Sequence, residues 1–413
     1  MHLLLLNLED LLLCLWCGTL KREVSNTDAW EWVKLVGSTW EDHGKTVANT
    51  TQYFPSSFQR PPRNPAEKLS SGYKATEYYL YVFGLGPGLF RTILDAEYWQ
   101  NFCQLTSGVC ILLQWSITGG QIQNAQRLLV NFAEGYENLY YQRREDRLHF
   151  CRPCVHTVGA HAVSEIIRLG PGAYSTQFAM ERTIGDLGQE VKQPSNPFAN
   201  LAQRALRRAQ VNALKIILPE VDSDTGYTLP KGAIDLGEGR VLLRPRERKL
   251  YQAEFKEGDL LMNQFGSSYV RRWGRFRLPN GQIARSLYIE QEIFKKRKPR
   301  NTWNVKIKSN GITEFGEVWY YFITTDKEVF AMVSVYGRPD PDLLCQSSNA
   351  LWACKYLSSQ NLHVVPVARL QSVVSMQPLP IFPHEQEGQW FVVQKPGIDN
   401  ALITGHEDNM DVI

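Results

Sequence analysis

The chain has 413 residues and a formal net charge of +3, and its 43% hydrophobic and 21% charged residues are the proportions of an ordinary globular protein. These proportions exclude a disordered acidic chain and a membrane bundle, and the length allows two or three domains. The eight cysteines are spread over the whole sequence, without the density of a small disulfide-bonded scaffold, which favours a reducing, intracellular compartment.

The first segment, residues 1–16, is rich in leucine and has some features of a signal peptide. Its uninterrupted apolar run stops at Asn7, no run of basic residues precedes it, and Glu9 and Asp10 follow. A signal peptide needs a basic start, and a membrane span needs about 20 mostly apolar residues. We therefore expect a helix of the protein core here, and no membrane association.

Residues 1–218 are predicted to be mainly helical. Apolar residues recur at helical spacing between 121 and 147, as at Leu128, Leu129 and Phe132, which predicts one buried and one charged face. Prolines between 53 and 73 predict a loop, because no regular helix can begin there before Pro65. A further helix is predicted from soon after Gly172 to near Pro194.

The residue composition of the chain changes after residue 218. Residues 219–302 combine turn residues with basic side chains, and we predict a basic linker and DNA-contact region. Between 303 and 378 apolar and polar residues alternate, as at Val305 and Ile307, which predicts short strands in a small, SH3-like β-barrel. Residues 379–413 are predicted to be a flexible acidic tail. The expected fold class is therefore α+β.

Positive charge is concentrated between Tyr269 and Arg300. This segment holds ten basic and two acidic residues, a local charge of +8, so the rest of the chain carries −5. Such a patch is able to neutralise phosphates, although a solvated basic face is the alternative. A second basic stripe has helical spacing. The residues predicted to bind DNA are Arg204, Arg207, Arg208, Arg271, Arg272, Arg275, Arg277, Lys295, Lys296, Arg297 and Lys298.

Two short patterns contain residues that are able to hold metal ions. Cys151, Cys154 and His156 have the residue types of a zinc site, and the alternative is that these cysteines fill the core. Glu181 lies on the helix predicted after Gly172, with Arg182 beside it. A carboxylate on a rigid helix can supply one ligand to a two-metal nuclease site, whereas most helical glutamates are surface residues.

Over residues 1–378 the sequence resembles the carboxy-terminal half of fungal CACTA-like transposases of the Plavaka type. Matching runs include MHLLLLNLEDLLLCLWCGTL, ENLYYQRREDRLHFCRPCVH, MERTIGDLGQEVKQPSNPFANLAQ and RRWGRFRLPNGQIARS. The resemblance implies an RNase H-like DDE domain with a helical insertion, which uses three acidic residues and Mg²⁺ to cut and rejoin DNA. It also implies that Glu181 is the third acid and a Mg²⁺ ligand, with His156 and Arg182 near the active centre.

The sequence departs from this family at its start. Family members carry an aspartate directly before the Met-His-Leu that here is Met1-His2-Leu3, and that aspartate resembles the second catalytic acid. We therefore expect the first two acids to lie upstream and this chain alone not to cut DNA. The predicted function is that of a nuclear, DNA-associated protein derived from a transposase. DNA is the expected partner, a homo-oligomer is a further candidate, and no small-molecule substrate is expected. The alternative is a non-enzymatic nucleic-acid or protein interaction module.

Overall fold

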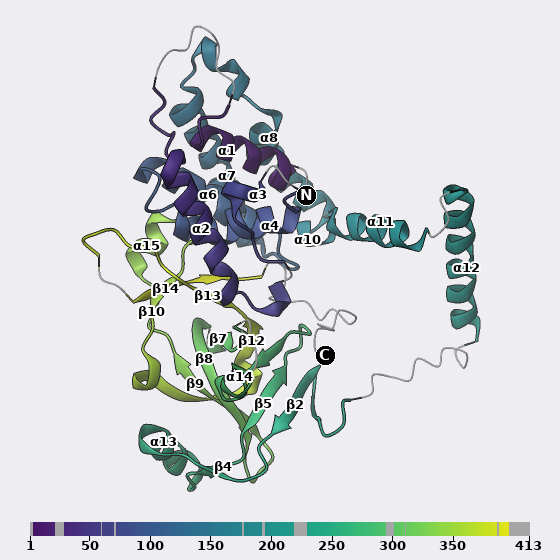
Figure 1. Cartoon of the computed structure of the whole chain (residues 1–413), viewed down its shortest axis with the longest axis vertical. Helices are drawn as coiled ribbons and strands as arrows, with labels where there is room; N and C mark the ends of the chain where they lie inside the picture. The colour runs from purple at the N-terminus through teal and green to yellow at the C-terminus, as the bar shows by residue number, and fades with distance from the viewer. Residues whose placement is uncertain are drawn as a thin grey trace.

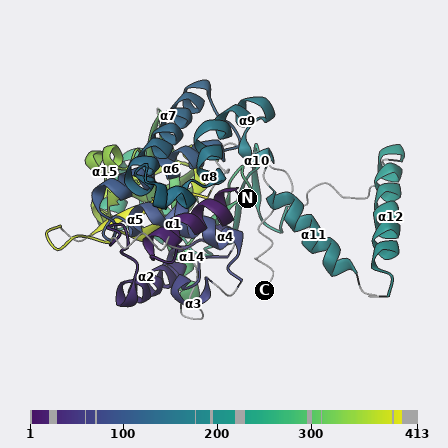
Figure 2. The same cartoon turned by 90° about the horizontal axis from the view of Figure 1, so that it is seen from above.

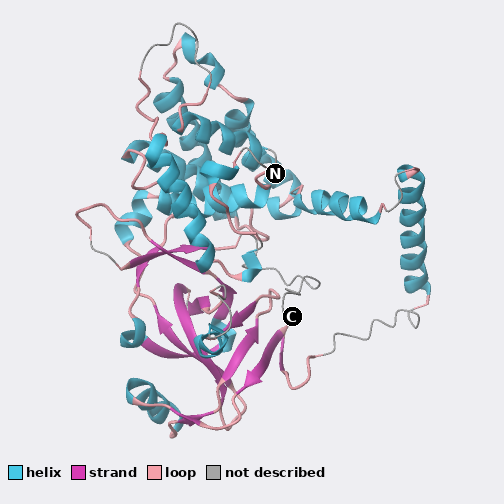
Figure 3. Cartoon of the chain, in the orientation of Figure 1, coloured by secondary structure: helices cyan, strands magenta, loops and turns pink. Residues whose placement is uncertain are grey.

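The computed structural model describes residues 3–20, 29–58, 60–69, 72–175, 177–191, 195–218, 229–294, 301–309, 311–385 and 388–395. A helical body lies against a region of β-sheet, and two helices, α11 and α12, project to one side of the body (Figures 1 and 3). None of the described helices has the length and apolar character needed to span a bilayer. This arrangement agrees with the predicted α+β class.

The helical body is formed by the first part of the chain, and its described residues contain no strand. The body begins with the π-helical segment η1 (Leu3–Leu8). The α-helices and further π-helical segments that follow are α1 (Glu9–Trp16), α2 (Gly37–Asn49), α3 (Pro65–Lys68), α4 (Ala75–Tyr79), η4 (Leu80–Leu85), α5 (Gly86–Leu89), α6 (Ala96–Leu112), α7 (Gly119–Tyr136), η5 (Glu137–Tyr141), α8 (Pro153–His156), η7 (Thr157–His161), α9 (Ala162–Leu169) and α10 (Gly172–Ser175). The projecting helices are α11 (Phe178–Glu190) and α12 (Pro197–Ile217).

The leucine-rich start forms a core helix, as predicted. In α1 the side chains of Leu12, Leu15 and Trp16 are fully or almost fully buried, and the Trp16 ring packs against Phe90 with ring centroids 4.9 Å apart. The predicted amphipathic helix is α7, whose apolar face, including Phe132, belongs to the same core. The recurrence of apolar residues at helical spacing therefore located the buried face of α7 correctly.

Pro65 is the first residue of α3, as the proline pattern predicted. The side chain of Asn64 accepts a hydrogen bond from the Ala66 N–H at 3.0 Å, which caps the helix, and Pro65 needs no hydrogen-bond partner at this position because it has no N–H. The preceding chain from Thr50 to Phe58 forms only 3₁₀ turns.

The second part of the chain forms the sheets. The strands are β1 (Ile234–Gly237), β2 (Arg240–Arg246), β3 (Tyr251–Gln252), β4 (Tyr269–Val270), β5 (Trp273–Arg277), β6 (Ile283–Arg285), β7 (Asn304–Ser309), β8 (Ile312–Ile323), β9 (Val329–Val335), β10 (Ala353–Lys355), β11 (Leu362–Pro366), β12 (Leu370–Val373), β13 (Ser375–Pro378) and β14 (Gln389–Val393). Three helices accompany them: α13 (Phe255–Phe265), α14 (Leu287–Phe294) and α15 (Pro341–Gln346).

The main sheet is open where a small barrel was predicted. Its order is β1-β2-β5-β8-β7-β12, with β6 beside β5 and with β9 between β8 and β11. In the described residues β1 and β12 are not paired with each other, so the sheet does not close. Strands from the predicted linker region, 219–302, pair directly with strands that follow residue 303, through the contact of Trp273 with Tyr321.

A small sheet, β10-β14-β13, joins the β region to the helical body. Its central strand β14 lies within residues predicted to be a tail, and the prediction missed it because a five-residue strand among prolines and acids gives a weak pattern. Phe391 and Val393 of β14 are buried in the core of the helical body. The Ser375 hydroxyl also donates a hydrogen bond to the Tyr53 carbonyl at 2.8 Å.

Candidate nucleic-acid interface

Strands β2 and β5 bring together arginines that are exposed in β2 and half-buried in β5. They pair antiparallel, with Leu243 opposite Arg275 and Arg246 opposite Trp273. The Arg275 Nε donates a hydrogen bond to the Arg244 carbonyl at 2.6 Å, and the Arg246 guanidinium lies 5.5 Å from the centroid of the Trp273 ring. We define the basic surface as Arg244, Arg246, Arg271, Arg275 and Arg277.

Little negative charge lies in the two segments that form this surface. Residues 269–285 contain five basic residues and no acidic one, and residues 240–249 contain five basic residues and one glutamate. Sequence reasoning missed Arg244 and Arg246, which belong to the second segment. The available signal was the density of basic residues between 240 and 249.

Arg272 takes part in an internal network. Its guanidinium donates to Glu247 at 2.8 and 3.1 Å and lies 3.8 Å from the ring centroid of Tyr251 and 4.1 Å from that of Tyr288. A guanidinium held by a carboxylate and between two rings is poorly placed to reach a phosphate. We therefore leave Arg272 out of the basic surface, although it was predicted to bind DNA.

The second basic stripe lies on α12, well away from the sheet (Figures 1 and 2). Arg204 lies 3.7 Å from a Glu190 oxygen and Arg208 forms a close ion pair with the same carboxylate, whereas Arg207 is exposed. No side chain of α12 is buried. The structure therefore does not bring Arg204, Arg207 and Arg208 to the basic surface on β2 and β5.

The predicted catalytic residues are only partly described. Glu181 and Arg182 lie in α11, but their side chains fall outside the described residues, as do Lys295, Lys296, Arg297 and Lys298. His156 ends α8, which packs against η1. Its Nε2 lies 3.1 Å from the Nε2 of His161, a distance at which one ring nitrogen donates and the other accepts.

The zinc alternative gains no support from the geometry. Within the described part of the chain, no three His, Cys, Asp or Glu side chains are arranged to hold a metal ion. Cys154 is buried and Cys151 is exposed. The helical body packs around Cys154 as around an ordinary apolar residue.

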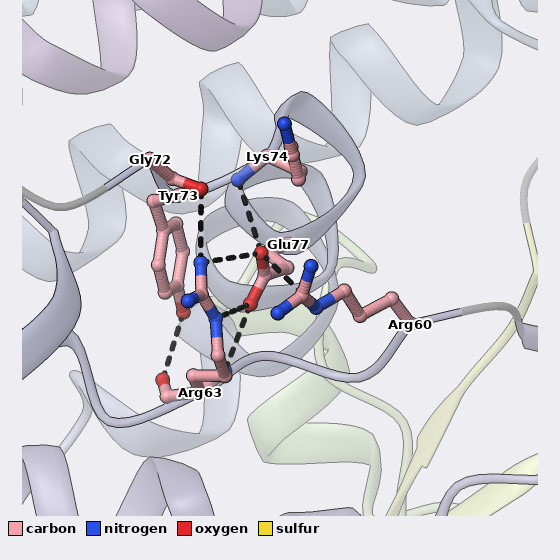
Figure 4. Close-up of polar contacts among 6 residues, drawn as sticks. All are labelled: Arg60, Arg63, Gly72, Tyr73, Lys74 and Glu77. Carbon is pink, nitrogen blue, oxygen red and sulfur yellow. Dashed lines mark hydrogen bonds and ion pairs between the residues drawn. The ribbon is translucent and has the colours of Figure 1, made fainter. Parts of the chain in front are cut away.

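A buried carboxylate, Glu77, is held by two arginines and a backbone amide (Figure 4). Arg63 donates to its two oxygens at 2.6 and 2.9 Å, the Lys74 N–H donates at 3.0 Å, and the Arg60 Nε lies 3.5 Å away. Tyr73 completes the cluster by donating to the Arg63 carbonyl. Since donors from the chain itself occupy both oxygens, this cluster connects residues 60–63 to residues 72–77 and is not a metal site.

Glu9 on α1 is a second buried carboxylate, and it is isolated. Its side chain is fully buried and neither oxygen has a hydrogen-bond partner among the described residues. Burial raises the pKa of Glu9 well above its ordinary value, because the charged form loses its hydration. The neutral acid is therefore the form that the fold favours.

Replacement of Glu9 by methionine is expected to stabilise the protein at pH 7 by about 1–3 kcal/mol, the cost of burying an unpaired polar group. Because the pKa of Glu9 is raised in the folded state, its contribution to the free energy of unfolding is most favourable below the unfolded-state pKa of about 4.3. That contribution is lost as pH rises through the folded-state pKa. Urea unfolding from pH 4 to 8 measures this, with exposed Asp10→Asn as the control. A destabilised Glu9→Met variant would mean that the carboxylate has a favourable partner.

The comparisons with known proteins give no relative: no family model, curated protein or solved structure matches this chain.

Proposed function

We propose that this protein binds duplex DNA through the basic surface, and that it derives from a DDE transposase as the sequence resemblance implies. The observation that carries the proposal is the pairing of β2 with β5, which gathers arginines from two separate segments. Neighbouring strands lie about 4.8 Å apart, so these side chains are close enough to contact several phosphates of one duplex.

The chemistry of these side chains suits contact with the phosphates of DNA. Arginine presents a planar set of donors that matches a phosphate, and it stays charged at any physiological pH. Contacts of this kind position a protein on DNA without reading its sequence. The proposal therefore predicts weak sequence preference, a strong dependence on salt and a nuclear location.

The catalytic part of the proposal comes from the sequence resemblance. Mg²⁺, with Glu181 as its expected ligand, rests on the resemblance alone, as do the RNase H-like and SH3-like assignments. The second candidate function is a non-enzymatic interaction module, which is favoured by the uncovered apolar side chains of α12, such as Phe198 and Ile216; a homo-oligomer is one partner that would cover them. Mg²⁺-dependent DNA nicking that is lost in Glu181→Ala would favour the enzyme over the module.

Fluorescence anisotropy with a labelled duplex at several salt concentrations tests the DNA-binding proposal. If each of the five side chains contacts one phosphate, the slope of log K against log salt is expected to be about −4.5, since each contact contributes about −0.9. Combined replacement of Arg244, Arg246 and Arg271 by glutamine should reduce the slope to about −1.8.

Arg168→Gln is the matched control for this experiment, because Arg168 is exposed on α9 and lies outside the basic surface. It should bind as the parent chain does. Circular dichroism checks that the triple variant is folded, since Arg246 packs over Trp273. Undetectable binding at low salt, or an equal slope in the triple variant and the parent, would contradict the proposal.

A further inference from the structure

A cleft of about 510 Å³ lies where the helical body meets the main sheet. One wall comes from the end of α4, η4, α6 and the start of α7, and the other from β7, β8 and β12. Residues 349–352, the end of β14 and the two residues after it complete the cleft, so that segments distant in sequence share one cavity. The volume lies within the range of about 300–1,000 Å³ that small-molecule sites occupy. Its polar lining residues include Gln121, Asn124, Lys306, Lys308, Gln394 and Lys395.

Among the described residues, the lining of this cleft contains three lysines and no aspartate or glutamate. Lys306 and Lys308 are alternate residues of β7, which places both on the same side of the strand. A cavity with positive charge and without carboxylates attracts anions, and its low-dielectric walls concentrate the field there. The chain as a whole holds nearly equal numbers of acidic and basic residues, so this composition is a local feature.

Three side-chain amides of the lining accept hydrogen bonds through their oxygens. The Gln121 Oε1 accepts from the Thr118 N–H at 2.8 Å, and the Asn124 Oδ1 accepts from Arg127 at 2.7 Å. The Gln394 Oε1 accepts from the Lys306 Nζ at 2.9 Å. Since each amide oxygen is engaged, the NH₂ group is the end of each side chain that is left to meet a ligand.

We propose that this cleft binds the phosphate of a nucleotide, either a free nucleotide or the end unit of a single nucleic-acid strand. Lysines supply the charge for the phosphate oxygens, and amide donors supply directed hydrogen bonds to phosphate, sugar or base. Trp352, which is half-buried, adds an aromatic ring against which a base can lie. The cleft shares no residue with the basic surface, because β8 separates β7 from β5. This site is therefore additional to the proposed duplex surface.

Isothermal titration calorimetry with deoxyadenosine 5′-monophosphate and with a 5′-phosphorylated trinucleotide of deoxyadenosine tests this site. We expect both to bind and unphosphorylated deoxyadenosine not to bind. Tighter binding of the trinucleotide by tenfold or more would assign the cleft to a strand end, and equal binding would assign it to a free nucleotide. Inorganic phosphate that competes as well as the monophosphate would overturn the nucleotide assignment.

Two variants connect the binding to the cleft. Combined Lys306→Gln and Lys308→Gln should weaken the monophosphate at least tenfold. Asn124→Asp has the same shape and brings a negative charge into the lining, so it should weaken binding as well. Lys327→Gln, in the exposed turn between β8 and β9, is the matched control and should bind normally. Unchanged affinity in both cleft variants, or no binding by the parent chain, would overturn the proposal.

Duplex binding in the same variants separates this site from the proposed function. The cleft variants should bind duplex DNA with the salt slope of the parent chain, because Arg244, Arg246 and Arg271 are intact. Nucleotide binding without duplex DNA binding would contradict the proposed function but would still support the cleft proposal. Thermal unfolding of each variant establishes that a loss of binding is not a loss of fold.

Discussion

Replacement of Glu77 by alanine is expected to lower the free energy of unfolding at pH 7 by about 3–5 kcal/mol, the usual cost of removing one partner of a buried ion pair. The Glu77 side chain has no exposed surface, and Arg63, its bidentate partner, is 29% exposed. The loss should lie near the lower end of that range, because the partly exposed Arg63 side chain is able to regain water. Chemical unfolding followed by circular dichroism measures it.

The contribution of Glu77 also depends on pH. Burial acts to raise the pKa of Glu77, but hydrogen bonds from Arg63 and the Lys74 N–H, with the charges of Arg60 and Arg63, outweigh it and leave the pKa below its ordinary value. For a carboxyl group with a lowered folded-state pKa, the stabilisation is present above the unfolded pKa of about 4.3 and is lost as pH falls through the folded value. The difference between the parent chain and Glu77→Ala should therefore shrink in acid.

Glu134→Ala is the control, because Glu134 is exposed on α7. It should change the stability by less than about 0.5 kcal/mol. Glu77→Gln keeps the shape of the side chain and removes its charge. Its free energy of unfolding should therefore lie between those of the parent chain and Glu77→Ala. Equal stability of Glu77→Ala and the parent at pH 7 would show that the arginine cluster does not hold this segment.

The sequence predicted the elements whose pattern is local and repeated. Helix α7 follows from apolar residues at helical spacing, α3 from Pro65, and β7 from the alternation of Val305 and Ile307. In each case the signal lies within one element. Strand β2 was not predicted, because its arginines and proline are typical of a turn-rich linker. It forms a strand by pairing with β5, where Leu242 lies opposite Phe276. Pairing between strands separated by an intervening helix is not visible in the spacing of either strand.

The candidate sites were less predictable than the fold for the same reason. The density of arginine between 271 and 277 indicated a basic surface, but Arg272 is removed from it by Glu247 and two tyrosines, contacts that depend on the packing of α14 and β3. The cleft at Lys306 forms only where the helical body meets the sheet. Residues from six or more elements line it, and no short motif marks them.

Replacement of Trp16 by alanine should lower the stability of the helical body by about 3–5 kcal/mol, the usual cost of removing a buried tryptophan. Trp16 has no exposed surface, packs edge-on against Phe102 with ring centroids 5.4 Å apart, and donates its Nε1–H to the Tyr140 hydroxyl at 2.9 Å. Alanine would leave both a cavity and an unpaired hydroxyl, because the close-packed neighbours collapse only partly.

Two further variants divide this loss between packing and hydrogen bonding. Trp16→Phe keeps much of the ring volume and removes the N–H, whereas Tyr140→Phe removes only the hydroxyl, so each should cost less than Trp16→Ala. The double variant Trp16→Phe with Tyr140→Phe leaves no unpaired donor or acceptor and should cost less than the sum of the two single changes. Thermal and urea unfolding measure all four variants. A loss below about 1 kcal/mol for Trp16→Ala would mean that α1 is not part of the cooperative core, and the leucine-rich start would then need another explanation than burial.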